Sequence, residues 1–237
     1  MAVTHFRAKT LDILYDVGFR TPFFSLARSN VEVLQALYQQ FAPKYGIQSS
    51  DLQAVGGTVL SHLRATLTLF RGNGIIEISS DRLHAKFTNA TAKDDGVIVQ
   101  DCISRALIAL ADFVPESQLG TELVTIHSFL GIAGGTKHRN AFLDRFQIPY
   151  IDALSKSFTD RAISPAIKLD IQSESEKWSI SVELSRAWGD AEAIFLALNG
   201  NFSMGISVQT LPRRAEIIQD VLKRILGAVG LESESQG

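Results

Sequence analysis

The chain has 237 residues, of which 46% are hydrophobic and 20% are charged, and its formal net charge is −2. This length supports one large domain or two small ones, with a core that needs no metal or disulfide to fold. The near-neutral charge excludes an overall basic field that would attract nucleic acid, and the single cysteine, Cys102, excludes an intrachain disulfide.

The first elements are a strand and a helix. Alternating apolar residues predict a strand over residues 11–20. Ser29 and Glu32 have the spacing of a capping box, which predicts the start of a helix that ends near Pro43 and Gly46. Its predicted apolar stripe consists of Val31, Leu34, Tyr38, Phe41 and Tyr45.

Three strands and a second helix follow. The pattern predicts strands at residues 59–70, 76–78 and 83–87, with a tight turn at residues 72–74. An acidic start at Asp94 and Asp95 predicts a helix that continues to Phe113, since carboxylates suit the positive end of a helix dipole. Cys102 falls within this helix, where we expect a small buried side chain.

The same order of elements recurs in the second half. We predict a strand at residues 124–129, a helix at residues 137–146, and a short helix at residues 150–158. Strands are predicted at residues 167–171, 178–184 and 191–198, with turns at residues 188–190 and 199–201. A last helix starts near Thr210, and its polar face is expected to carry Arg213, Arg214, Glu216, Asp220, Lys223 and Arg224.

These elements predict an α+β fold in which helices back an antiparallel sheet. Residues 1–115 and 116–237 would form two similar β-α-β-β-β-α halves of one pseudo-symmetric unit. The order resembles that of the helix-grip ligand carriers and of the saddle-shaped TATA-binding proteins. This resemblance concerns the fold alone, and fold does not imply function.

A glycine-rich segment gives one candidate site, for an anion. A predicted strand leads into glycines at a helix start, where backbone N–H groups can hold phosphate or carboxylate. The candidate residues are Gly134, Gly135, Thr136, Lys137 and Arg139. The order is not that of a phosphate-binding Walker loop, because Thr136 precedes Lys137. The alternative is a flexible turn before a solvated helix.

A second candidate is a basic sheet face formed by His62, Arg64, His84 and Lys86. Neighbouring strands would bring these side chains together as a surface for nucleic acid or an acidic partner. Interleaved aromatic residues, which stack bases in single-strand binders, are missing. This absence disfavours a nucleic-acid partner, and a solvated sheet face is the alternative.

Catalytic signals are weak. His127 is the single catalytic candidate, with Glu183 or Asp170 as a partner for proton transfer. The sequence contains no nucleophile motif and no metal-ligand spacing, so we predict no cofactor and no metal. Trp188, beside Gly189 and Asp190 in a predicted turn, is a candidate contact residue for another subunit. Trp178, Trp188, Phe195 and Phe202 could line a cavity under the last helix.

The sequence favours a non-enzymatic binding or protein-interaction module that self-associates through strand edges or the last helix. The expected partner is a second copy or another protein. An anion-dependent enzyme that uses residues 131–139 and His127 is the alternative, and a nucleic-acid-binding saddle is a weaker one. Lacking a signal peptide and any apolar run of about 18 residues, the chain is expected to be complete and cytoplasmic, without a membrane partner.

Overall fold

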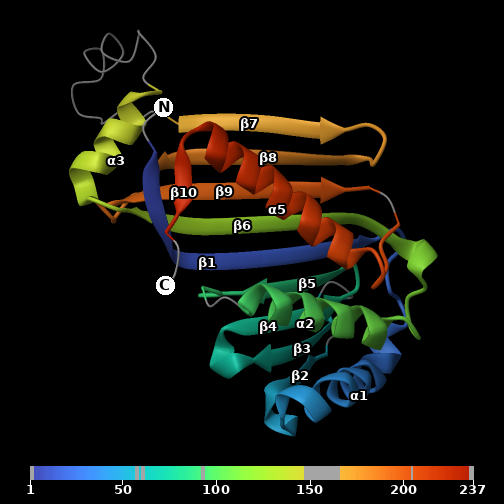
Figure 1. Cartoon of the computed structure of the whole chain (residues 1–237). Coiled ribbons are helices and arrows are strands. Elements are labelled where there is room, and N and C mark those ends of the chain that lie inside the picture. The colour runs from blue at the N-terminus through green and yellow to red at the C-terminus, as the bar shows by residue number, and fades with distance from the viewer. Residues whose placement is uncertain are drawn as a thin grey trace.

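The computed structural model describes residues 3–56, 59, 62–91, 94–146, 166–203 and 205–234. Within these ranges the chain is an α+β protein, in which four α-helices accompany one open sheet of ten strands, nearly all antiparallel (Figure 1). The predicted class, an antiparallel sheet backed by helices, is confirmed.

The strands are β1 (Thr4–Phe19), β2 (Leu52–Val55), β3 (Arg64–Leu69), β4 (Gly74–Ser79), β5 (Arg82–Phe87), β6 (Leu119–Ile132), β7 (Ala166–Ser173), β8 (Trp178–Arg186), β9 (Ala193–Phe202) and β10 (Leu231–Ser233). The helices are α1 (Leu26–Tyr45), α2 (Asp95–Leu110), α3 (Gly135–Asp144) and α5 (Leu211–Ala228).

The strand order in the sheet is β2-β3-β4-β5-β1-β6-β9-β8-β7. The two longest strands, β1 and β6, pair at the centre, and β2 and β7 form the two edges. A register shift in β1 between Ala8 and Thr10 separates the main strand from its first residues, which pair in parallel with β10. Strand β10 was not predicted.

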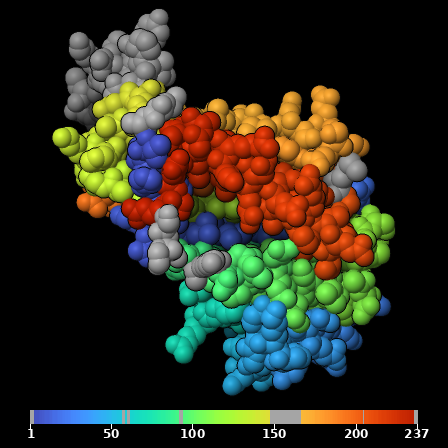
Figure 2. Space-filling model, in the orientation of Figure 1, coloured from blue at the N-terminus to red at the C-terminus, as the bar shows by residue number. Residues whose placement is uncertain are grey.

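One face of the sheet is buried under helices, and no helix of the described residues covers the other, which is called the helix-free face below. The alternation predicted for the strands is present, since Ile76 and Ile78 of β4 are fully buried while Glu77 points to the opposite side. Helices α1, α2 and α5 lie over the buried face (Figures 1 and 2). Helix α3 lies instead at one end of the sheet, where Phe142 packs in a second, smaller core with Phe6.

The predicted apolar stripe of α1 is confirmed in part, because Phe41 is fully buried and Leu34 and Tyr45 pack against the core, whereas Val31 and Tyr38 are exposed. The helix starts at Leu26, before the predicted capping box, and Ser29 forms a kink with φ −110° and ψ 15°. The buried residues are Leu26, Val33, Leu37 and Phe41, whereas Val31 is 67% exposed and Tyr38 is 43% exposed. Apolar residues lie on two sides of this helix, so periodicity alone did not identify the side that packs.

Several strand boundaries also differ from the prediction. Strand β3 starts at Arg64 and not at residue 59, and β2 was not predicted. Residues 199–201, predicted as a turn, lie inside β9. A Cβ atom at Gly200 would lie 3.1 Å from the ring of Phe202, so this glycine provides room for an aromatic ring. The predicted helix at residues 150–158 lies outside the described residues.

Candidate functional site

The helix-free face of the sheet holds three of the four residues of the predicted basic surface. Arg64 lies on β3, and His84 and Lys86 lie on β5, each alternating with buried residues that face the helices. His62 is exposed but precedes β3, and so is not part of the strand. The sheet therefore brings together Arg64, His84 and Lys86, with His62 at the margin.

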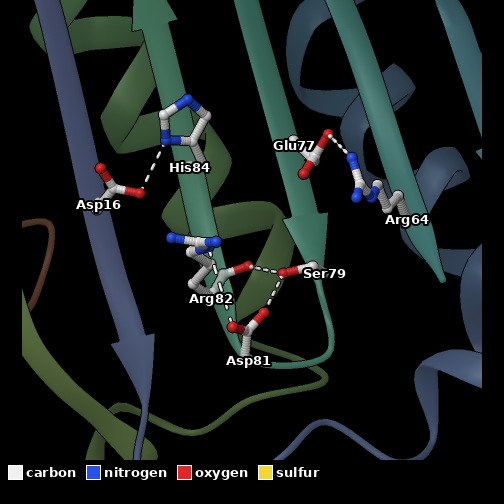
Figure 3. Close-up of polar contacts among 7 residues, drawn as sticks. All are labelled: Asp16, Arg64, Glu77, Ser79, Asp81, Arg82 and His84. Carbon is white, nitrogen blue, oxygen red and sulfur yellow. Dashed lines mark hydrogen bonds and ion pairs between the residues drawn. The ribbon is translucent and has the colours of Figure 1, made fainter. Parts of the chain in front are cut away.

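Carboxylates of neighbouring strands pair with two of these basic groups. The Arg64 guanidinium lies 3.4 Å from the Glu77 carboxylate of β4, and His84 Nδ1 lies 2.8 Å from Asp16 Oδ1 of β1 (Figure 3). Figure 3 also shows polar contacts at the β4–β5 turn, made by Ser79, Asp81 and Arg82. The face thus presents opposite charges side by side, and these pairs weaken the positive field that nucleic acid requires.

Aromatic residues occupy the middle of the helix-free face. Phe129 of β6 lies directly opposite Phe195 of β9, with ring centroids 5.6 Å apart, and the His127 ring lies 5.5 Å from that of Phe195. Leu123 lies on the same side of β6 and is 45% exposed. Contiguous exposed apolar patches with polar surroundings are typical of contact surfaces, whereas single exposed apolar residues are common on any protein.

The structure does not bring His127 into contact with the carboxylates considered for proton transfer. Ala197 separates His127 from Glu183 in the sheet, which places the two backbones two strand spacings apart, about 10 Å. Asp170 lies on β7, one strand beyond Glu183. Within the described ranges, no hydrogen bond or ion pair joins His127 to a carboxylate, and its cross-strand neighbour on β1 is Asp12.

The glycine-rich segment forms the start of α3, as the sequence indicated. Gly134 and Gly135 have φ values of +87° and +71°, a conformation that side chains other than glycine rarely adopt. His138 folds back over this turn, with its Nδ1 atom 3.0 Å from the Gly134 carbonyl oxygen. Thr136 and Lys137 are not buried. The turn therefore needs its glycines for backbone geometry, whether or not an anion binds.

Arg139 differs from the other residues of this segment because it is buried. Its side chain is only 2% exposed, and its Nε and Nη1 atoms have no hydrogen-bond partner among the residues that the structure describes. Burial, with the nearby positive charge of Arg186, lowers the pKa of Arg139, while Asp190 acts in the opposite direction. Asp190 itself pairs with Lys9 at 2.7 Å. A buried guanidinium with two nitrogen atoms that lack acceptors among the described residues is an unusual feature.

The glycine-rich segment and His127 do not form one site. Gly131 follows His127 by four residues along β6, which corresponds to about 13 Å of strand. Proton transfer by His127 to a group bound at the start of α3 would therefore need a ligand that spans this distance.

The four aromatic residues expected to line one cavity are divided between three places. Trp178 and Phe202 pack against the core under α5, and Phe195 lies on the helix-free face. Trp188 is 71% exposed in the β8–β9 turn, with the Arg186 guanidinium 5.8 Å from its ring. The predicted position of Trp188 in an exposed turn is thus observed, and a shared cavity is not.

A groove lies between α5 and the edge of the sheet. It has a volume of about 440 Å³, an apolar floor that includes Ile171, Trp178 and Val221, and charged residues of α5 along its rim. In the first half, α1 and α2 both cover the sheet, whereas in the second half α3 lies away from β7 (Figure 1). Figure 2 shows the orange atoms of β7 at the margin of the molecule, beside α5.

Sequence reasoning missed a buried polar cluster between the start of β6 and the first turn of α5. Arg214, expected on the polar face of α5, is 8% exposed, and its Nε atom lies 3.3 Å from Oε2 of the fully buried Glu122. Burial raises the pKa of Glu122, and the Arg214 charge opposes that shift. The Tyr15 hydroxyl is also buried beside Glu122. The signal available in the sequence was a glutamate among alternating apolar residues of β6.

No family model and no curated protein matches this sequence. Within the described ranges, no cluster of histidine, cysteine or carboxylate side chains has the arrangement of a metal site. None of the helices described here has the length and apolar character needed to cross a membrane.

Proposed function

We propose that this protein is a non-enzymatic protein-interaction module of the cytoplasm that associates with itself. The observation that carries this proposal is the edge strand β7. It pairs with β8 over all eight of its residues without a bulge, and its outer side has no partner strand among the described residues. A long regular edge presents a row of backbone N–H and C=O groups that favours pairing with another strand.

The side chains of β7 support the same proposal. Leu169 is 38% exposed, and Ile167 and Ile171 are only partly buried. Together with the groove beside α5, these residues give the edge an apolar side that a second chain would cover. The aromatic middle of the helix-free face, with Phe129 and Phe195, offers a further contact surface for another protein.

The proposal includes a pseudo-two-fold relation between the halves. Apart from the additional edge strand β2, the first half has the order β3-β4-β5-β1 towards the centre, and the second has β7-β8-β9-β6. In both halves a helix follows the first strand, and another helix follows β5 or β9; the second half then adds the short strand β10 after α5. This agreement supports residues 1–115 and 116–237 as two similar units of a saddle-like or helix-grip body, joined through β1 and β6.

Sedimentation equilibrium tests the proposed self-association directly. The expected result over about 1 to 100 µM protein is a mass that rises with concentration from one chain to two, since an edge contact of limited area gives a dissociation constant on the order of micromolar. Hydrogen exchange compared between the two ends of that range should show added protection of β7 amides at the higher concentration. A monomer at every concentration would contradict the proposal.

A second candidate function is the binding of a small anion at the start of α3, as in an anion-dependent enzyme. The observation that favours it is the buried Arg139 guanidinium, whose Nε and Nη1 atoms lack hydrogen-bond acceptors among the described residues. Lys9 and Arg186 add positive charge near it, although Asp190 offsets part of that charge.

Calorimetric titration with inorganic phosphate and with nucleotides tests the anion site. The anion site is supported if the wild type binds and Arg139→Gln does not. The control is Lys223→Gln, which removes the same charge at an exposed position of α5. The absence of heat from the wild type, or equal heat from the wild type and Arg139→Gln, would remove this candidate.

A further inference from the structure

The edge strand β7 has a sequence that is complementary to itself. Leu169 lies at its centre, with Lys168 and Asp170 on either side and Ile167 and Ile171 beyond them. Reading outwards from Leu169 in either direction therefore gives a charged residue and then an isoleucine, and the two charges have opposite signs. An antiparallel pair of two such strands would match each charge with its opposite.

The orientation of these side chains follows from the pairing of β7 with β8. Lys168 lies opposite Glu183 and Asp170 lies opposite Ser181, both on the helix-free face, while Leu169 lies opposite the buried Val182. Lys168 and Asp170 are exposed, and within the described ranges neither makes an ion pair. Each of the two charges is therefore available to a second chain at the edge.

Three neighbouring registers can be compared for antiparallel pairing of β7 with a second copy. A two-fold axis perpendicular to the sheet keeps the helices of both copies on one side, so residues that oppose each other must share a face. An axis at residue 168 sets Lys168 against Lys168, and an axis at residue 170 sets Asp170 against Asp170. An axis at Leu169 sets Lys168 of each copy against Asp170 of the other.

We propose that two copies of this chain join through antiparallel pairing of their β7 strands about a two-fold axis at Leu169. This inference rests on the proposed self-association and specifies its surface and register. Two Lys168–Asp170 pairs then form on the helix-free face, across the seam where the two β7 strands meet. On the other face, the two Leu169 side chains meet, and each Ile167 lies opposite Ile171 of the second copy.

The surrounding residues favour this arrangement. Glu183 of β8, Lys168 of the same chain and Asp170 of the second copy would form a row of alternating charge across the seam. Opposite charges directly across a strand pair stabilise it, and like charges destabilise it. The groove beside α5 shares Ile171 with the seam, so pairing extends its apolar floor towards the second copy.

Charge reversal measured by sedimentation equilibrium tests this register. In the dimer of Asp170→Lys, the introduced lysine of each copy faces Lys168 of the other. This variant should therefore weaken self-association by about tenfold or more. Lys168→Asp should do the same, because the introduced aspartate then faces Asp170. An equimolar mixture of the two variants pairs only opposite charges at the seam, so it should form a heterodimer with affinity close to that of the wild type.

The mixture also controls for folding, since a variant that had lost its fold could not restore association. Asp112→Lys, an equal charge change at an exposed turn after α2, should leave association unchanged. Association of the wild type that is insensitive to Asp170→Lys, or a mixture that stays monomeric, would overturn the register while leaving self-association intact. A monomeric wild type would instead remove the proposed function, and the inference with it.

Discussion

At the scale of single residues, the buried pair of Glu122 and Arg214 shows where alternation and helical periodicity fail as guides. Both residues occupy positions that face the core, and the sequence contains no sign that one charge neutralises the other across 92 residues. Taking two charges out of water is unfavourable unless they remain paired. The pair connects β6 to α5, so it fixes how the last helix lies on the sheet.

Replacing Glu122 by glutamine tests this description. Because the variant removes the carboxylate charge beside the buried Arg214 guanidinium, the free energy of unfolding should fall by roughly 3 kcal/mol. Glu216→Gln, which breaks the exposed pair with Arg213 on the same helix, should change it by less than about 1 kcal/mol. Urea unfolding measures both, and equal small effects would contradict the importance of the buried pair.

At the scale of elements, α1 shows that sequence can locate a helix without identifying its packed side. Leu37 is fully buried and Val31 is largely exposed, although both are aliphatic and lie on the same helix. The buried face of alternating strands such as β4 and β8 was easier to predict, because a strand has only two faces and the apolar one is buried. A helix with apolar residues on two sides leaves that choice to tertiary contacts.

Paired substitutions in α1 test the observed register. Leu37→Ala should lower the free energy of unfolding by about 3 kcal/mol, since it leaves a cavity under the helix. Val31→Ala should change it by no more than about 0.5 kcal/mol. The prediction made from sequence, with Val31 in the core, requires a substantial loss for Val31→Ala as well, so urea unfolding of the two variants separates the alternatives.

The Asp101 carboxylate of α2 joins this helix to α1 through polar contacts. Asp101 accepts hydrogen bonds of 2.7 Å from the Tyr45 hydroxyl and from Arg105 Nε, and Lys44 lies 3.0 Å away. Burial acts to raise the pKa of Asp101, but these hydrogen bonds outweigh it and lower the pKa from 3.8 to about 2. The folded state therefore binds a proton at Asp101 less readily than the unfolded state does.

This shift gives a definite pH dependence. Because the pKa is depressed on folding, the stabilisation is present above the unfolded value and is lost as the pH falls through the folded value. It amounts to roughly 2 kcal/mol. The difference in unfolding free energy between wild type and Asp101→Asn should therefore be largest above about pH 5 and shrink towards pH 2. A difference that does not change with pH would contradict this.

At the scale of the whole molecule, the sequence predicted the class of fold and most strands, because alternation and turn residues are local signals. It did not predict the order of strands, the parallel pairing of β10 with β1, or the contacts of Arg139 and Arg214, because these join distant segments. The alternation in the sequence did not indicate that Lys168 and Asp170 could act together as a pair. Their complementarity becomes visible only once β7 is known to be an edge.

An engineered disulfide at the centre of β7 tests the central claim most directly. Residues that oppose each other in an antiparallel pair have Cα atoms about 4.5 to 5.5 Å apart, within reach of a disulfide. In a Cys102→Ser background, Leu169→Cys should give a covalent dimer under mild oxidation. Asp170→Cys should not, because its two copies would lie about 8 Å apart, beyond the usual limit. No cross-link from Leu169→Cys, or equal cross-linking from both, would contradict pairing about Leu169.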